Sequence, residues 1–298
     1  MEDPLSNAAP PATVLLASDL GARCDRALDR AALLARQWRA GLVVVHAADA
    51  PGAPDLALAW SSSTDPRVLE RQAGERLRED VAASGVDARL VVARGEPAAA
   101  VAEHAGRLGA GLVVTAMARD EPFGRFLVGS TVQRLARTLR APLLVVRGRA
   151  RVPYRRIVLA TDFSPCAGHA LRTVLRWFPD TAPVLFHARA PIGTIPPDPD
   201  EAREFAAGIR RTEGADFLAT QLPADVDRTR IELVVECAPL ETALAAHVRR
   251  EGVELVALGT HGRGGLLKAL LGSTAARLLD WMPCDTLLVR APPGATTA

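Results

Sequence analysis

The sequence lacks the features of several large classes of protein, and each absence narrows its function. No apolar run approaches the roughly 20 residues that a membrane-spanning helix requires. The first 12 residues lack the basic start and apolar core of a secretory signal. The four cysteines stand alone, without the C-x-x-C spacing of zinc or thiol-exchange sites. We therefore expect a cytoplasmic protein with reduced, structural thiols and no membrane partner.

An excess of charge of one sign is also missing. Lys and Arg number 36 and Asp and Glu 34, which leaves a net charge of +2 with the two signs interspersed. No basic patch for nucleic acid is therefore visible, and we expect no nucleic-acid partner. The 6 histidines are scattered without paired spacing, so we expect no metal site and interpret His46, His104, His187 and His247 as structural.

Two common nucleotide motifs are absent as well. No Gly-Lys-Ser or Gly-Lys-Thr sequence occurs, which excludes a P-loop. Gly262-x-Gly264 is followed by Leu267 where the dinucleotide fingerprint needs a third glycine. A nucleotide site, if present, must therefore use another pattern.

Such a pattern occurs where a short apolar stretch, Leu255 to Leu258, leads into a glycine-rich loop and a helical run. The spacing is G-x-x-G-x9-G-S, from Gly259 through Gly262 to Gly272 and Ser273. Glycine admits positive φ and close approach of a ligand to the backbone. A helix that begins at Gly272 directs its unpaired N–H groups and the positive end of its dipole into the loop. The pattern predicts an anion site, and a tight turn that needs glycine for steric reasons is the alternative.

The chain repeats itself with a long period. Asp19 and Asp162, His104 and His247, Gly129 and Gly272, and Arg147 and Arg290 are each 143 residues apart. A period of this length indicates a duplicated domain rather than a solenoid repeat. Each copy is long enough to bury a core of its own.

Short apolar strands alternate with helical patterns in both copies. The predicted strands are 13–18, 42–47, 88–93, 112–116 and 143–147, then 157–161, 184–188, 231–236, 255–258 and 286–290. The predicted helices are 25–39, 65–84, 97–108 and 129–139, then 165–178, 200–218, 240–250 and one from 272. This alternation is typical of a parallel, doubly wound α/β sheet. We expect a disordered lead (1–12), a first domain (13–148), a linker (149–155), a second domain (156–291) and a tail (292–298).

The spacing of Gly259, Gly262, Gly272 and Ser273 resembles, residue for residue, the ATP-binding signature of the universal stress protein family. With the repeat, almost the whole chain resembles the tandem type. The resemblance implies two five-stranded domains of the adenine-nucleotide alpha-hydrolase-like fold, with strand order 3-2-1-4-5 and a ligand site where this order reverses. It also implies that the fifth strands pair, which would make the chain a pseudo-dimer. A homodimer and an unknown protein partner stay open.

The resemblance further implies that ATP or a related adenine nucleotide, with or without Mg²⁺, binds the second domain. Similar proteins place an aspartate that recognises adenosine after the first strand, where Thr161 and Asp162 stand. A carboxylate accepts hydrogen bonds from N–H and O–H groups, which suits adenine or ribose. An N-cap of the following helix is the alternative for Asp162. Both hold if Ser164 is the cap.

The remaining expected ligand contacts lie in the glycine-rich stretch: Gly259, Gly262, Arg263, Gly272, Ser273 and Thr274. The first two glycines let the loop fold over ribose and phosphates. The N–H of Gly272 and the residues Ser273 and Thr274 would donate to phosphate oxygens, or the latter two simply start a helix. Arg263 either meets the outer phosphates or faces solvent.

The first copy departs from this pattern. Ungapped alignment places Ala116 and Arg119 at the positions of Gly259 and Gly262, and Asp120-Glu121-Pro122 follows. Asp19 and Gly129-Ser130-Thr131 remain. An arginine side chain and added acidic groups would obstruct a triphosphate, so we expect the first domain to bind ATP weakly or not at all.

The leading hypothesis is a nucleotide-binding stress or regulatory protein. Slow ATP hydrolysis or phosphotransfer is a second hypothesis, but it needs a base and charge neutralisation, and we assign no catalytic residue. A scaffold that binds no nucleotide is a third. Replacing Gly259 or Gly272 by a bulky residue should abolish a nucleotide-dependent function while the fold persists.

Overall fold

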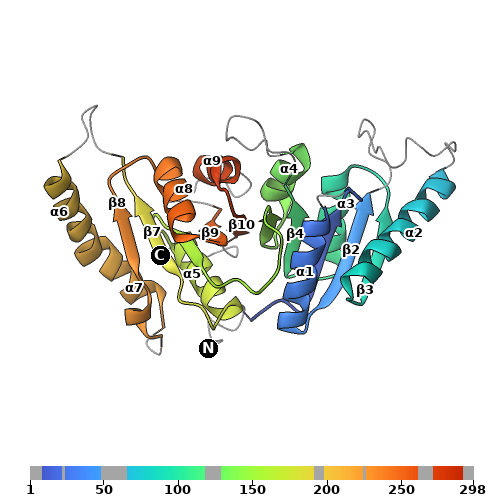
Figure 1. Ribbon diagram of the computed structural model, residues 1–298, viewed down its shortest axis with the longest axis horizontal. Helices are drawn as coiled ribbons and strands as arrows, with labels where there is room; N and C mark the ends of the chain where they lie inside the picture. The colour runs from blue at the N-terminus through green and yellow to red at the C-terminus, as the bar shows by residue number, and fades with distance from the viewer. Residues whose placement is uncertain are drawn as a thin grey trace. The chain divides into compact units, whose positions relative to one another are not determined.

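A computed structural model of the chain describes residues 9–21, 24–47, 66–117, 129–190, 198–223, 226–260 and 271–290. These residues form two compact units (Figure 1). The N-terminal domain comprises residues 10–117 and 129–153, and the C-terminal domain comprises Ala9 and the described residues from 154 to 290.

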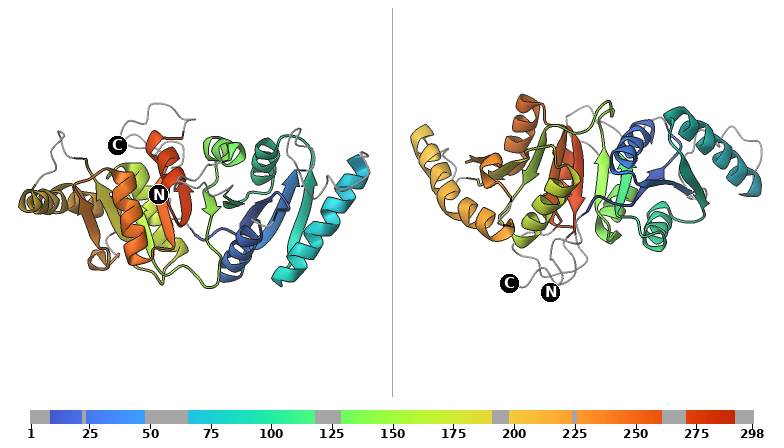
Figure 2. Two further views of the ribbon diagram at one scale, coloured as in Figure 1. Left: turned by 45° about the horizontal axis from the view of Figure 1, so that its top comes forward. Right: turned by 90° about the horizontal axis from the view of Figure 1, so that it is seen from below.

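The N-terminal domain is a parallel sheet with the strand order β3-β2-β1-β4-β5. Its strands are β1 (Thr13–Ser18), β2 (Gly41–Ala47), β3 (Ala88–Ala93), β4 (Leu112–Ala116) and β5 (Leu143–Val146). Its helices are α1 (Cys24–Trp38), α2 (Pro66–Ser84), α3 (Pro97–Arg107) and α4 (Ser130–Thr138). Helix α1 contacts α2 and α3 contacts α4, so that helices cover both faces of the sheet (Figure 2).

The C-terminal domain repeats this order as β8-β7-β6-β9-β10, again with parallel strands. Its strands are β6 (Ile157–Ala160), β7 (Val184–Ala188), β8 (Leu233–Glu236), β9 (Leu255–Gly259) and β10 (Asp285–Val289). Its helices are α5 (Pro165–Trp177), α6 (Pro199–Ile209), α7 (Ala215–Gln221), α8 (Leu240–Glu251) and α9 (Ser273–Trp281). A π-helix, η2 (Arg210–Gly214), joins α6 to α7, and a 3₁₀ turn, η3 (Arg228–Arg230), precedes β8.

The expected α/β class and the strand order 3-2-1-4-5 are confirmed in both domains. The apolar runs form strands because both of their faces are covered; the consecutive residues Val14, Leu15 and Leu16, for example, are all buried. Local caps set the helix starts. Glu96 accepts hydrogen bonds from the first N–H groups of α3, and Asp198 forms a capping box with Glu201 at α6.

One predicted helix differs from the observed structure. We expected a single helix over residues 200–218, whereas the chain forms α6, the π-helix η2 and α7 in succession. Gly214, the last residue of η2, lies against β8, because a Cβ on it would collide with a methyl carbon of Leu233. The wider π turn therefore accompanies a close approach of this helix to the sheet.

Two residues of the expected disordered lead form hydrogen bonds within the protein. The carbonyl of Ala9 accepts a hydrogen bond from the Trp177 indole at 3.2 Å, and the carbonyl of Ala12 accepts one from the Gly41 amide at 2.9 Å. Residues 1–8 of the expected lead, the expected tail (292–298), the loop expected at 49–64 and residues 191–197 of the loop expected at 191–199 lie outside the described residues. Among the described helices, none is both long and apolar enough to cross a membrane.

Candidate functional site

The carboxyl ends of β6 and β9 lie side by side in the C-terminal domain. The strands are paired in parallel, with Leu159 beside Ala257 and Ala160 beside Leu258. The strand order reverses between these two strands, since β7 and β8 lie on one side of β6 and β9 and β10 lie on the other. Open α/β sheets bind ligands at such an edge. The residues directly beyond β6 and β9 therefore form the candidate site.

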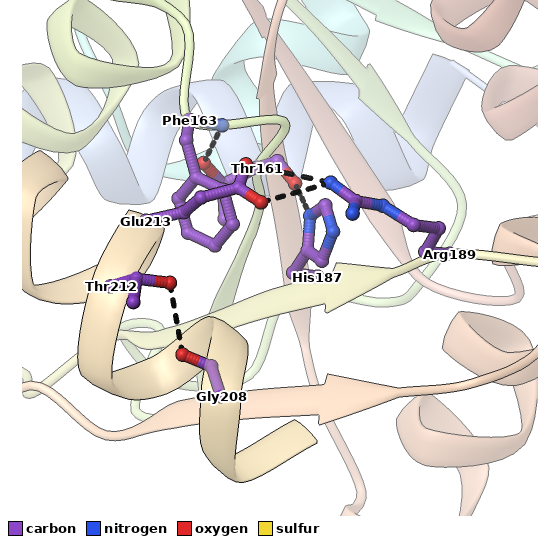
Figure 3. Close-up of polar contacts among 7 residues, drawn as sticks. All are labelled: Thr161, Phe163, His187, Arg189, Gly208, Thr212 and Glu213. Atoms are coloured by element: carbon purple, nitrogen blue, oxygen red, sulfur yellow. Dashed lines mark hydrogen bonds and ion pairs between the residues drawn. The ribbon is translucent and has the colours of Figure 1, made fainter. Parts of the chain in front are cut away.

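Thr161 begins the turn between β6 and α5, and each of its polar groups has a partner within the protein. Figure 3 shows the contacts with Phe163 and His187. Its amide donates to the carbonyl of Phe186 at 2.9 Å. Its carbonyl lies 2.9 Å from Nδ1 of His187, and its hydroxyl oxygen accepts the amide of Phe163 at 2.9 Å. Thr161 is buried. This expected ligand contact thus builds the turn.

Asp162 and Ser164 accept different backbone amides in this turn. The hydroxyl oxygen of Ser164 accepts the Ala167 amide at 3.3 Å, and Pro165 is the first residue of α5, so Ser164 is the N-cap. The half-buried Asp162 accepts the Ser164 amide through Oδ1 at 3.0 Å. The two interpretations of the sequence are therefore compatible, because Asp162 is not the cap.

The charge of Asp162 also influences a neighbouring thiol. Burial, and secondly the carboxylate of Asp162, raise the pKa of Cys166 above its ordinary value. Cys166 lies in the first turn of α5, where the helix dipole by itself would lower a thiol pKa. The C-terminal site therefore holds its cysteine as a neutral thiol.

Gly259 ends β9 and packs directly against the start of α5. A Cβ at this position would lie 3.0 Å from the carbonyl carbon and oxygen of Cys166 and 3.2 Å from its Cβ. Two backbone segments meet here, so neither can rotate out of the way. Gly259 is therefore needed for packing within the domain, independently of the ligand contact that we expect for it.

Thr260, the residue after β9, forms two backbone hydrogen bonds. Its amide donates to the carbonyl of Val289 at 3.1 Å, and its carbonyl accepts the amide of Gly272 at 3.0 Å. A Cβ on Gly272 would lie 3.1 Å from the same Thr260 oxygen. The Gly272 N–H, which we expected to face a phosphate, thus donates to a carbonyl within the protein in this structure.

Helix α9 begins directly after this contact. Gly272 is its N-cap residue and offers no side-chain hydrogen bond, and the first turn holds no acidic residue. Ser273 and Thr274 are exposed. The first turn of a helix presents N–H donors and the positive end of the helix dipole. The start of α9 is thus suited to an anion. The other two expected contacts, Gly262 and Arg263, lie outside the described residues.

The equivalent turn of the N-terminal domain uses its aspartate internally. Oδ1 of Asp19 accepts the Gly21 amide at 2.8 Å and the Cys24 thiol at 2.9 Å. Burial, together with the negative charge of Asp19, raises the pKa of Cys24 to about 12, so this thiol keeps its proton. Ala116 ends β4 where Gly259 ends β9, and Gly129 is the N-cap residue of α4. Arg119 and Asp120-Glu121-Pro122 lie outside the described residues.

One contact that we did not predict from the sequence links His187 to the site. We noted that the histidines of the two copies recur and interpreted them as structural, and they do lie in strands and helices. We did not predict that His187 contacts the carbonyl of Thr161, the residue before Asp162. Nor did we predict its contact with the ring of Phe163, whose centroid is 4.6 Å from that of His187. The sequence signal for this contact was the position of His187 near the end of the second strand of its domain, since parallel strands end at the same edge of a sheet.

Known proteins of one family resemble this chain. A universal stress protein of Mycolicibacterium smegmatis is 29% identical over 180 residues, which is 56% of this chain and 57% of that protein. Universal stress protein A homolog 2 of Coxiella burnetii is 34% identical over 73 residues, or 24% of this chain and 47% of that protein. The chain thus spans about half the length of these curated relatives.

A solved structure with a similar fold and a family model agree with these sequence similarities. The crystal structure of a universal stress protein from Archaeoglobus fulgidus matches with a TM-score of 0.65 at 16% identity, covering 97% of this chain and 99% of that chain. At this identity the match concerns the fold alone. The family model described as "Universal stress protein family" matches residues 12–147 and again 153–290. The chain therefore belongs to the universal stress protein family and contains two family domains in tandem.

Proposed function

We propose that the C-terminal domain binds ATP or a related adenine nucleotide, and that the protein acts in stress response or regulation through nucleotide-dependent conformation or partner binding. One observation carries the proposal. A half-buried carboxylate, Asp162, and the start of α9 stand beyond the ends of the adjacent strands β6 and β9. A nucleoside needs acceptors and a polyphosphate needs donors, and this edge of the sheet offers both.

The proposed contacts follow from the chemistry of each group. The Asp162 carboxylate would accept hydrogen bonds from ribose or adenine. The N–H groups at the start of α9, with the exposed Ser273 and Thr274, would bind phosphate oxygens. The hydrogen bond between Gly272 and Thr260 ties the start of α9 to the residue after β9, which supports a short distance between the two halves of the site.

Other parts of the nucleotide site remain predictions from the resemblance. Contacts of Gly262 and Arg263 with the phosphates belong to this group, and so does a Mg²⁺ ion bound with them. Thr161 would contribute indirectly, as the residue that holds the turn before Asp162.

We further propose that the chain has a single nucleotide site. In the N-terminal domain one oxygen of Asp19 already accepts both the Gly21 amide and the Cys24 thiol. Ala116 adds a methyl group where the C-terminal domain has glycine. Asp162 also accepts a backbone amide, so the added methyl group is the difference that supports weak binding or none in that domain.

Calorimetric titration of the nucleotide-free chain with ATP tests the proposal, together with identification of any nucleotide that is released on purification. We expect one ATP per chain. Asp162→Asn keeps an oxygen for the Ser164 amide but removes the charge and should weaken binding about 10-fold or more, as expected for a lost charged hydrogen bond. The matched change in the other domain, Asp19→Asn, should leave ATP affinity unchanged.

The outcomes separate the classes of function. Two ATP per chain would contradict the single site, and no binding by the folded protein would favour a scaffold. Turnover of ATP above background that falls when one specific acid or base is replaced would favour the enzyme hypothesis. Cytoplasmic location, pairing of the fifth strands, a homodimer and a protein partner remain predictions.

A further inference from the structure

A histidine from the next strand holds the turn that carries Asp162 (Figure 3). Nδ1 of His187 lies 2.9 Å from the carbonyl oxygen of Thr161. Because a carbonyl oxygen only accepts, Nδ1 carries the proton and donates it. The ring of His187 also stacks on Phe163, with ring centroids 4.6 Å apart. His187 therefore contacts the residue before Asp162 and the residue after it.

The N-terminal domain has the same arrangement around Asp19, although the neighbouring residues differ. Nδ1 of His46 lies 2.9 Å from the carbonyl oxygen of Ser18, and the hydroxyl oxygen of Ser18 accepts the Leu20 amide at 3.1 Å. Both histidines are buried, with 2% of His46 and 7% of His187 exposed. The histidine bond is thus a property of the turn itself and not of one local sequence.

The residue after each aspartate has a backbone conformation that needs support. Phe163 has a φ of 61° and Leu20 a φ of 56°, in the left-handed region that residues with a Cβ seldom adopt. Such a conformation persists where the surroundings over-determine it. At Phe163 these surroundings are the His187 ring, the bond to the Thr161 hydroxyl and an edge contact with Phe217 at 5.6 Å.

We infer that His187 is a positioning residue for nucleotide binding: it directs the Asp162 carboxylate by holding the carbonyl of Thr161 and the ring of Phe163. This inference rests on the proposed function of the C-terminal domain. Without the histidine the turn relaxes toward a commoner backbone conformation. The Asp162 carboxylate is then still present but is no longer oriented toward the nucleotide. Its hydrogen bonds to the nucleotide weaken, because hydrogen bonds weaken steeply when they are misaligned.

The test compares three variants of the full, nucleotide-free chain by calorimetric titration with ATP. His187→Leu removes the donor, His187→Asn offers a side-chain N–H near the position of Nδ1, and His46→Leu removes the same bond from the other domain. We expect His187→Leu to weaken ATP binding about 10- to 100-fold, by analogy with residues that orient the ligands of a metal ion. His187→Asn should stay within about threefold of the wild type, and His46→Leu should bind as the wild type does.

Thermal melting separates positioning from a loss of structure. Both leucine variants lose the same bond, so their melting temperatures should fall by comparable amounts while only one loses ATP affinity. Should His187→Leu fail to fold, His187→Gln replaces it, because its amide reaches the position of Nε2 rather than Nδ1, and the same weakening is expected.

Two results overturn the inference while the proposed function survives. One is a folded His187→Leu or His187→Gln variant that binds ATP as tightly as the wild type. The other is a His187→Asn variant that binds as weakly as His187→Leu. If the wild-type chain itself binds no ATP, the proposed function fails, and the inference fails with it.

Discussion

Replacing Gly259 by alanine places one methyl group between the end of β9 and the first turn of α5. The new Cβ would lie 3.0 Å from the carbonyl carbon and oxygen of Cys166 and 3.2 Å from its Cβ. Carbon atoms pack best about 3.5–4.0 Å apart. The strand and the helix must therefore separate by roughly half an ångström, since neither backbone can rotate aside.

The cost of this separation follows from measured effects of overpacking. An extra methyl group in a well-packed core destabilises a protein by about 1–3 kcal/mol. For a domain of this size such a loss lowers the melting temperature by roughly 3–10 °C. ATP affinity should fall as well, because α5 carries the turn with Asp162 at its start.

Hydrogen exchange read by mass spectrometry is the appropriate assay, because it reports the C-terminal domain separately from the other one. Amides of β9 and α5 should exchange faster in Gly259→Ala than in the wild type. Gly208→Ala in α6 is the matched control. Nothing lies within 4 Å of a Cβ at Gly208, and a helical Gly-to-Ala change should stabilise the domain by about 0.5–1 kcal/mol.

Unchanged protection and an unchanged melting temperature in Gly259→Ala would refute this reasoning. The geometry also corrects our expectation that bulky replacements at Gly259 or Gly272 spare the fold. Both glycines contact backbone atoms, of Cys166 and Thr260 respectively. A loss of function in such variants would therefore not distinguish a lost ligand contact from a displaced helix, whereas Asp162→Asn does.

Three further predictions concern the same two domains. Ser164→Ala removes the N-cap of α5 and should cost about 1 kcal/mol of stability in urea denaturation; an unaltered midpoint would contradict that role. Under native conditions iodoacetamide should label the half-buried Cys237 well before Cys24, whose pKa is raised to about 12 by burial and by Asp19, and equal rates would refute this order. Burial, and next Arg250, lower the pKa of His247 from its ordinary 6.5. The unfolded chain therefore takes up a proton at this position more readily than the folded one, and stability should fall as the pH drops below about 6.5. His247→Gln should flatten this dependence in urea denaturation at different pH values.

The architecture was predictable because its signals are local or periodic. Apolar runs such as Leu42 to Val45 become strands buried on both faces, and the strand boundaries agree with the prediction within two residues. No spacing in the sequence indicates the order of the strands, which only the resemblance to the family implied. The π turn at Arg210–Gly214 was not predictable either, since it accompanies a contact with Leu233 on a separate strand.

The sequence by itself determined the repeat and the alternation of strands and helices, because both are recurring patterns of residue type, and it left the cap of α5 open between Asp162 and Ser164. Only the tertiary structure decided which groups of the candidate site already contact other parts of the protein. His187 reaches Thr161 across 26 positions through the pairing of β6 with β7, and Gly259 meets α5 because β9 pairs with β6. Parallel strands bring together residues that lie far apart in the chain, and their register leaves no short-range pattern in the sequence.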